Sequence, residues 1–339
     1  MKSDIILLGH GSGGTLSHHL LDELIVPTLS GIRPCDQNDA AVLPEVPGRL
    51  AFTTDSYVVD PLFFPGGDIG CLAIYGTVND LAMAGARPLF ISVGLILEEG
   101  LAVADLKAVL QSLRAAADRC QVRIVTGDTK VVPRGKADKL FINTAGVGVL
   151  EHDLQIAGSG ACPGDRVLIN GPFGDHGMAV LASREGLALT SPIASDCAPL
   201  HELVADLLAN LGPAVHVLRD PTRGGVATTL KEIARQSDVA IILDESTLPV
   251  NPAVAGACAI LGLDPLFVAN EGKLLACIAP AAAEAALAIM RRHAPAGAAG
   301  PAVIGEVVGE SGGKVRLRTA IGGLRAIEML AGEQLPRIC

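Results

Sequence analysis

Strand-like and helix-like runs alternate along this chain, and that alternation limits the possible fold more than any other feature. Residues 89–97, "LFISVGLIL", form the nearly continuous apolar run of a buried strand. Residues 101–120 have the spacing of an amphipathic helix, and the strand-like run "VRIVTGD" follows at 122–128. The same half is completed by "RLAFTTDS" at 49–56, "DIGCLAIYGTVNDLAMAG" at 68–85 and "LFINTAGVGVL" at 140–150. Such alternation is typical of α/β domains, in which helices cover a sheet.

A second alternation begins after the Gly-rich stretch "QIAGSGACPGDR", residues 155–166, which we take as a domain junction. Strands are predicted at 166–171, 239–243, 274–279, 302–308 and 314–318, and helices at 175–186, 223–236, 280–292 and 323–330. We therefore expect an N-terminal domain at 1–155, a C-terminal α/β domain at 156–331, and a flexible tail at 332–339.

Composition excludes several classes of protein. Half of the 339 residues are apolar and the chain has no tryptophan, so the core must consist mainly of Ala, Val, Leu and Ile. The net charge of −10 argues against general nucleic-acid binding, which needs a basic surface. The longest uncharged stretch, 246–263, contains two prolines and does not predict a membrane-spanning helix. The first residues lack the pattern of a signal peptide, so we expect a cytoplasmic protein.

Glycines near the N-terminus, in "GHGSGG", outline the G-x-G-x-x-G pattern of dinucleotide-binding proteins. A Rossmann unit needs a second strand that ends in an acid, and the chain after this motif does not supply one. We favour a flap whose backbone N–H groups cover phosphates, with Gly11 and Gly13 as candidate contacts. A mobile glycine-rich loop is the second interpretation, and an NAD site is a distant third. The chain contains no Walker A loop.

Four aspartates in the first half indicate how phosphates could be held instead. Asp39 comes just before "AAVL", and the other three, Asp55, Asp80 and Asp128, lie at or beside strand ends or within an apolar helix. A carboxylate in such a place is costly unless it is paired or binds a metal ion. The set therefore predicts Mg²⁺ ions that hold a triphosphate, although each aspartate alone could be a helix cap or a turn residue. Lys130, in "GDTK", places a cation within reach of the γ-phosphate.

The second half adds three polar candidates. Asp220 and Arg223 lie at the predicted start of a helix, where free N–H groups favour an anion. Glu271, in "ANEGK", comes just before a strand. A lone Glu in a turn is usually solvated, but beside an active site it could act as a base.

The chain ends on a cysteine, within "EQLPRIC". None of the eight cysteines forms a C-x-x-C pair, and most have apolar neighbours that predict a buried, inert thiol. Cys339 has no downstream chain to bury it. The seven residues 333–339 reach roughly 23–25 Å when extended, so this thiol could carry a group into a cleft. Termini also tolerate most residues, which is the plainer explanation.

Together these motifs resemble the HypE family of hydrogenase maturation proteins. The resemblance rests on "HGSGG", "TTDSYVVDPLFFPGGDIG", "GTVNDLAMAGA", "ILEEG", "IVTGDTKVV", "LFINTAGVG", "GDHG", "DPTRGG", "ANEGK" and the terminal "PRIC", and extends over the whole chain. HypE is similar to aminoimidazole ribonucleotide synthetase and selenophosphate synthetase, which share the aspartate pattern but not the cysteine tail. Those relatives often have paired acids at the first motif, where this chain has Asn38 and Asp39.

The resemblance implies a two-domain α/β (α+β) fold of the aminoimidazole ribonucleotide synthetase type. Its N-terminal sheet would pair with its twin in a homodimer, and ATP with Mg²⁺ would lie between the domains. A carbamoyltransferase, HypF, would load a carbamoyl group onto Cys339. The protein would dehydrate that S-carboxamide to a thiocyanate, and the cyanide would pass to iron held by a HypC–HypD complex, building the Fe(CN)₂CO centre of a [NiFe] hydrogenase.

Family motifs also imply roles for individual residues. Asp39, Asp55, Asp80 and Asp128 would hold Mg²⁺, and Lys130 would contact the γ-phosphate. Glu271 would remove protons, and Asn79 of "NDLA" would join the nucleotide site with Asp220 and Arg223. Two other functions remain open: a small-molecule ATP-dependent synthetase or kinase, which has no use for the terminal thiol, and a non-catalytic maturation scaffold.

Overall fold

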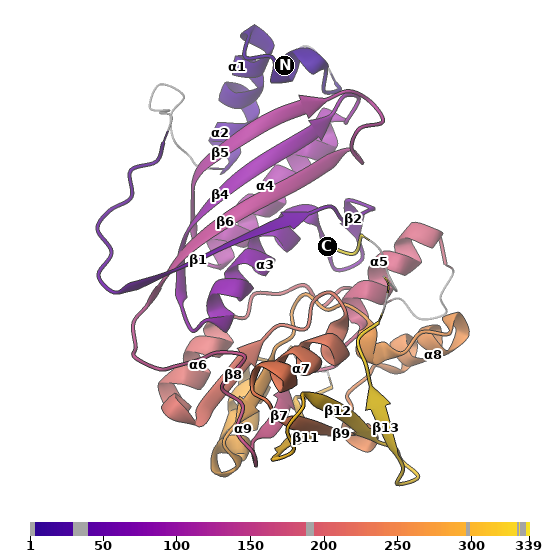
Figure 1. Cartoon of the computed structure of the whole chain (residues 1–339). Helices are drawn as coiled ribbons and strands as arrows, with labels where there is room; N and C mark the ends of the chain where they lie inside the picture. The colour runs from indigo at the N-terminus through magenta and orange to yellow at the C-terminus, as the bar shows by residue number, and fades with distance from the viewer. Residues whose placement is uncertain (1–3, 30–39, 188–192, 296–298, 331, 333–336) are drawn as a thin grey trace.

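The structure is a computed structural model that describes residues 4–29, 40–187, 193–295, 299–330, 332 and 337–339. The described residues form two large sheets, one in each half of the chain, and one small two-stranded sheet (Figure 1). The N-terminal sheet has the strand order β1-β6-β4-β5, and the C-terminal sheet has the order β13-β12-β9-β11-β7-β10-β8. The predicted α/β class is confirmed.

Four long strands build the N-terminal sheet: β1 (Arg49–Tyr57), β6 (Leu140–Leu150), β4 (Arg87–Glu98) and β5 (Arg123–Val132). All neighbours are antiparallel except β4 and β5, which are parallel. One face packs against α3 (Ile69–Met83) and α4 (Val103–Arg119). On the other face of the sheet, the side chains of Leu50 and Phe52 on β1 are 61% and 71% exposed.

The C-terminal sheet is covered on both faces. Helix α7 (Gly225–Gln236) packs on one side, and α6 (His201–Leu211) and α9 (Ala283–His293) pack on the other. Coverage of both faces explains why inner strands such as β7 and β10 are nearly all apolar, whereas β12 near the rim is not. The strands are β7 (Arg166–Ile169), β8 (Val215–Arg219), β9 (Ala240–Asp244), β10 (Leu275–Ile278), β11 (Ala302–Val308), β12 (Lys314–Arg318) and β13 (Leu324–Ile327).

Shorter elements connect these layers. At the N-terminal end, helical turns pack along β5, and a two-stranded ribbon follows β1. The shorter elements of the whole chain are η1 (Leu8–Gly11), α1 (Thr15–Leu20), η2 (Leu21–Ile25), α2 (Val26–Leu29), β2 (Phe63–Phe64), β3 (Gly67–Asp68), α5 (Asp175–Glu185), η4 (Gly212–Ala214), η5 (Glu245–Thr247), α8 (Pro252–Leu261), η6 (Pro265–Phe267) and η7 (Pro280–Ala282).

Two details of the sequence prediction are wrong. Residues 323–330 were expected to be helical, but 324–327 form strand β13, which pairs with β12 across a tight turn. Pairing with a neighbouring strand outweighs the helix-like spacing of so short a run. Asp55 and Asp128 were placed at strand ends, but both lie inside β1 and β5. The predicted domain boundaries at 155/156 and 331/332 stay predictions.

The C-terminus returns to the junction between the two sheets, beside β2 (Figure 1). Val58 donates its N–H to the carbonyl oxygen of Cys339 at 3.0 Å, so the last residues of the chain lie beside the end of β1. Ile338 is 2% exposed and packs in the core of the N-terminal domain. In the described part of the chain, no helix combines the length and apolar character needed to cross a membrane.

Candidate active site

A cavity of about 30 Å³ lies where the two sheets meet, and we call it the acid pocket. Six of the predicted site residues line it, although the chain separates them by up to 284 positions, from 55 to 339. Its lining consists of Asp55, Gly76, Asp80, Asp220, Thr222, Arg223, Glu271 and Cys339. The fold therefore gathers acids from both domains around the terminal cysteine.

Each acid is positioned by a different element. Asp55 comes from β1 and Asp80 from the last turn of α3, where Thr53 Oγ1 donates to Asp80 Oδ2 at 2.8 Å. Asp220 lies in the short connection from β8 to α7. Glu271 precedes β10 and is only 5% exposed, so it is not a solvated turn residue.

Burial and mutual repulsion raise the proton affinity of these acids. Burial, followed by the charges of Asp220 and Asp196, holds the pKa of Glu271 well above its usual range. Burial, with Asp220 as the next cause, raises the pKa of Asp80 to about 7. The pKa of Asp220 is also raised by burial. Carboxylates crowded in this way are stabilised by a bound cation, which favours their ionised forms.

The thiol of Cys339 lies among these acids and beside one cation. Burial first, and then the charge of Glu271, raises the pKa of Cys339 to about 12, while Arg223 acts in the opposite direction. The cation that faces this thiol is Arg223 and not Arg337, its near neighbour in the sequence. Instead, Arg337 pairs with Asp138 at 2.5 Å and donates to the carbonyl oxygen of Val58 at 3.1 Å.

The side chain of Asn79, which was predicted to contact nucleotide, bonds to the backbone of the C-terminal domain. It is 2% exposed, and its Nδ2 donates to the carbonyl oxygens of Ala198 at 3.1 Å and Glu271 at 3.3 Å. Its Oδ1 accepts from the N–H of Leu200 at 2.8 Å. All of its amide groups therefore hold the C-terminal domain against α3, and we assign it a positioning role.

The other predicted residues gather at the opposite edge of the N-terminal sheet, and we call Gly11, Gly13, Asp128 and Lys130 the flap cluster. Lys130 Nζ lies 2.7 Å from Asp128 Oδ2, and both side chains are more than 60% exposed. Gly11 packs so closely on β5 that a Cβ atom would lie 2.8 Å from the backbone nitrogen of Val131. All four residues line a cavity of about 920 Å³.

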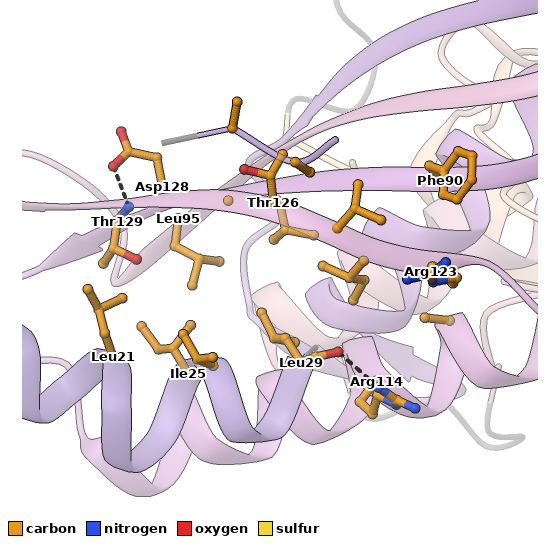
Figure 2. A pocket seen from close by; sticks show the side chains of 18 of the residues that line it. Leu21, Ile25, Leu29, Phe90, Leu95, Arg114, Arg123, Thr126, Asp128 and Thr129 are labelled. Atoms are coloured by element: carbon orange, nitrogen blue, oxygen red, sulfur yellow. Dashed lines mark hydrogen bonds between the residues drawn. The ribbon is translucent and has the colours of Figure 1, made fainter. Parts of the chain in front are cut away.

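That larger cavity has a polar rim and an apolar floor. Figure 2 shows Asp128 pointing away from the helices, while Leu21, Ile25 and Leu29 line the opposite wall. Its size is within the range that accommodates a nucleotide. Within one chain, however, β1 and β5 are the outer strands of the sheet, with β6 and β4 between them. The predicted site is therefore divided into two parts, and Asp39 lies outside the described residues.

Sequence reasoning did not single out several residues that shape the acid pocket. Thr53 contacts Asp80, and Thr222 and Gly76 line the pocket. His176 contacts the segment that ends in Cys339, and Ser195 contacts His176. His176 lies within the motif "GDHG", so a signal was present. The role of a neutral residue such as Thr53 cannot be predicted from the sequence, because it depends on which acid the packing of α3 on the sheet brings beside it.

Known proteins resemble this chain over its whole length. Residues 37–150 match the profile "AIR synthase related protein, N-terminal domain", and residues 162–318 match the corresponding C-terminal domain. Carbamoyl dehydratase HypE of Cupriavidus necator is 52% identical over 100% of this chain and 96% of its own. The chain belongs to the HypE family. It is thus an enzyme of the carbamoyl dehydratase type in hydrogenase maturation, as its motifs predicted.

Solved HypE structures share this fold. A HypE crystal structure in complex with ATP is 48% identical, covers 98% of this chain and 99% of its own, and superposes with a TM-score of 0.91. The HypE chain of a HypE–HypF complex is also 48% identical, with 83% of this chain and 90% of that chain covered and a TM-score of 0.79. The predicted HypE-type two-domain architecture is confirmed.

Proposed function

We propose that this chain dehydrates an S-carboxamide on its own Cys339 to a thiocyanate and consumes ATP in doing so. One observation carries the proposal: the thiol of Cys339 lies in the same small cavity as Glu271, Arg223 and three aspartates. A rival enzyme that acts on a free small molecule would have no reason to enclose its own terminus there. The ATP complex of a HypE relative supports the choice of nucleotide.

The chemistry begins with an amide oxygen that is a poor leaving group. In the first step this oxygen attacks the γ-phosphorus of ATP, ADP leaves, and one N–H proton is lost. In the second step the remaining N–H proton is removed and the C–O bond breaks, so that inorganic phosphate leaves and a C≡N triple bond forms. The sum is thiocarboxamide plus ATP giving thiocyanate, ADP and phosphate. Both proton losses need a base close to the terminal sulfur.

Glu271 is the group best placed to act as that base. It is buried, shares the acid pocket with Cys339, and has a raised pKa, which makes its ionised form a strong proton acceptor. Its N–H is held by Asp196 Oδ1 at 3.1 Å, and its carbonyl oxygen by Asn79. Arg223 lies beside the sulfur and would offset negative charge that develops there.

The acid pocket fits Mg²⁺ on the chemistry of its donors. Asp55, Asp80 and Asp220 present oxygen ligands, which Mg²⁺ prefers, and burial raises the pKa of Asp80 and of Asp220, so a bound cation would favour their ionised forms. These three residues, with Asp128 from the flap cluster, would hold the ion. When bound, it would screen the charge of the phosphates.

We further infer a homodimer in which β1 of one copy pairs with β5 of the other. Among the strands described, neither β1 nor β5 has a neighbour on its outer side, and unpaired edges favour pairing with another chain. The exposed Leu50 and Phe52 on β1 would be covered. This pairing would bring the flap cluster of one copy, with Lys130, to the acid pocket of the other.

A mixed-dimer experiment tests this arrangement. Lys130→Ala and Cys339→Ala are each expected to be inactive alone. If each site takes Lys130 from one copy and Cys339 from the other, a dimer of the two variants contains one intact site, and mixing restores part of the activity. If every site belongs to one chain, both sites of the mixed dimer stay defective and mixing restores nothing.

The partners follow from the same chemistry. The HypE–HypF complex of a relative supports HypF as the protein that loads the carbamoyl group. A HypC–HypD complex would receive the cyanide.

Intact-protein mass spectrometry tests the main reaction: with carbamoyl phosphate, ATP and the transferase, the chain should gain a carbamoyl group and then lose one water. Loss of water from a carbamoyl group on another cysteine would contradict the proposal.

A further inference from the structure

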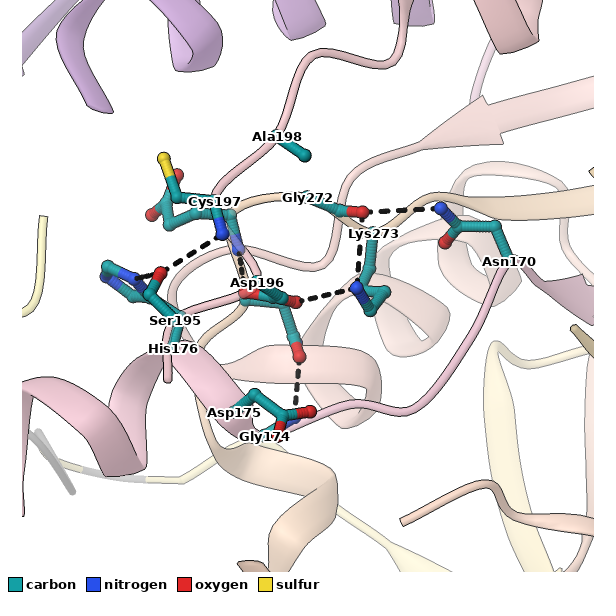
Figure 3. Close-up of polar contacts among 12 residues, drawn as sticks. Asn170, Gly174, Asp175, His176, Ser195, Asp196, Cys197, Ala198, Gly272 and Lys273 are labelled. Carbon is teal, nitrogen blue, oxygen red and sulfur yellow. Dashed lines mark hydrogen bonds and ion pairs between the residues drawn. The ribbon is translucent and has the colours of Figure 1, made fainter. Parts of the chain in front are cut away.

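One short segment, Ser195–Ala198, contacts the loop that contains Glu271, the N-terminal domain, and His176 of helix α5. The N–H of Ser195 donates to the carbonyl oxygen of Pro65 at 2.7 Å, and Asp196 Oδ1 accepts from the N–H of Glu271 at 3.1 Å. A Cβ atom on Gly272 would lie 1.9 Å from the carbonyl oxygen of Asp196, so only glycine allows this approach. Figure 3 shows the segment between His176 on one side and Gly272 and Lys273 on the other.

His176 joins this segment to the C-terminus. Its Nδ1 lies 2.8 Å from Ser195 Oγ, and its Nε2 lies 2.9 Å from the carbonyl oxygen of Ile338. A carbonyl oxygen only accepts, so Nε2 carries the proton and donates it. Ser195 Oγ already accepts from the N–H of Cys197 at 3.0 Å, so its hydroxyl is free to donate to Nδ1. Both contacts are satisfied by one neutral tautomer.

The imidazole is enclosed on its remaining sides. His176 is 0% exposed, and the Phe64 ring meets it edge to face with centroids 5.4 Å apart. The carbonyl oxygen of Ile338 is thus bonded from inside the protein, next to the buried Ile338 side chain. The neighbouring carbonyl oxygens of Arg337 and Cys339 accept from Arg184 Nη2 at 2.5 Å and from the N–H of Val58 at 3.0 Å.

We propose that His176 is a positioning residue: in its neutral form, with the tautomer set by Ser195, it holds the C-terminal segment so that Cys339 stays in the acid pocket. Because Ser195 and Asp196 are adjacent, the bond that holds the terminus and the bond that holds Glu271 depend on the same piece of backbone. Release of the terminus therefore loosens the support of the base as well. This inference concerns the location of Cys339 and holds whether or not the thiol carries a carbamoyl group.

Docking of the terminus is expected to weaken in acid. Burial is the main reason that the pKa of His176 is lowered from 6.5, while the charge of Asp196 and the bond to Ile338 oppose the shift. The other groups near the imidazole are the uncharged ring of Phe64 and, on the docked segment, Arg337 and Cys339 on either side of Ile338. When the segment leaves, the imidazole gains access to water and regains its ordinary pKa. A group whose pKa is depressed in the docked state stabilises docking above the ordinary value, and this stabilisation is lost as the pH falls below it.

The test measures how strongly the protein protects Cys339 from iodoacetamide. The alkylation rate of the free peptide EQLPRIC, divided by that of Cys339 in the full chain, gives a protection factor that cancels the intrinsic pH dependence of thiols. No nucleotide or partner is present, so the outcome is independent of the dehydratase reaction. Ile338→Asp supplies the fully undocked reference, and circular dichroism checks that each variant is folded.

The proposal makes distinct predictions for three proteins. The wild type is protected at pH 7.5, and its protection falls by up to about tenfold at pH 5.5. His176→Ala loses protection at both pH values, on the order of tenfold, because a buried carbonyl group loses its donor. His176→Gln, whose amide N–H replaces Nε2–H and does not titrate, is protected at both. Wild-type protection in a folded His176→Ala variant, or the wild-type acid response in His176→Gln, would overturn the proposal.

Discussion

The acid pocket and the flap cluster were both predicted from short acidic motifs, yet the structure gives them opposite characters. In the acid pocket, Glu271 is 5% exposed and burial raises the pKa of its carboxyl group. In the flap cluster, Asp128 is 69% exposed and its pKa is lowered, mainly by the bond from Lys130. The acids of the pocket are buried and share Arg223 as the one cation among the described residues of its lining, whereas Asp128 is exposed and paired directly with Lys130.

This difference indicates which half of the site is preformed. The acid pocket is closed by contacts from both domains and by the C-terminus, so its geometry exists before any ligand arrives. The flap cluster faces outward beside β5, an outer strand of the described sheet, and in the proposed dimer it acts against the acid pocket of the other copy. Substitutions in the acid pocket should therefore affect the chemical step and folding stability, and substitutions in the flap cluster should affect nucleotide binding.

The largest effect is expected for Cys339→Ala. The chain should fold and bind ATP, but it should incorporate no carbamoyl group and form no thiocyanate, because the carrier atom is missing. Cys162→Ala is the matched control, since that cysteine is exposed and does not line the acid pocket. Carbamoylation of folded Cys339→Ala, seen by intact mass, would remove the basis for treating the acid pocket as the reaction site.

Glu271→Gln should have the next largest effect. Loading of Cys339 should continue, while conversion of the carboxamide to thiocyanate slows by roughly 10²–10⁴-fold, the usual contribution of a positioned base. Single-turnover mass spectrometry of the preloaded protein separates the two steps. Normal conversion in this variant would transfer the role of base to another group and leave the acid pocket with a binding function only.

Asp80→Asn and Asp128→Asn compare the two regions directly. The pKa of Asp80 in the folded chain, about 7, exceeds the ordinary 3.8, so the native state binds the extra proton and its stability falls as the pH rises through that interval. Replacement by Asn removes this penalty and should stabilise the ligand-free protein by about 1–3 kcal/mol at pH 8. Asp128→Asn should give no gain, because Asp128 is exposed and paired.

Urea unfolding at pH 5 and pH 8 measures this comparison. The gain from Asp80→Asn should be larger at pH 8 than at pH 5, and both variants should lose activity. An equal gain for Asp128→Asn would show that the two regions do not differ in the way the structure indicates.

The smallest effect is expected for Gly11→Ala. A Cβ atom would meet the backbone nitrogen of Val131 at 2.8 Å, so the flap must shift away from β5. The KM for ATP should rise by a factor of about 3–10, as for a strain of roughly 1 kcal/mol, with little change in the rate of the preloaded protein at saturating ATP. Gly13→Ala instead tests the cost of placing alanine at a positive φ, because no atom of the described residues lies within 4 Å of its Cβ position. An unchanged KM in both variants would separate the flap from nucleotide binding.

Much of the architecture was predictable because its signals are local. The apolar run of β4 and the amphipathic spacing of α4 each depend on neighbours within a few residues. The error at β13 has the same origin: four residues carry too weak a pattern, and pairing with β12 decided their conformation. The helices α6 and α8 and the strand β8 were not anticipated.

By itself, the sequence determined the α/β class, the kinds of groups at the active site and the family, because residue types and motif spacing survive without coordinates. Only the tertiary structure decided which groups meet. It placed Cys339 among acids from two domains, gave Asn79 a positioning role and left Lys130 at the far edge of the sheet. The physical reason is that burial and long-range contacts, which set the pKa of Glu271 and hold the terminus through His176, arise from residues distant in the chain.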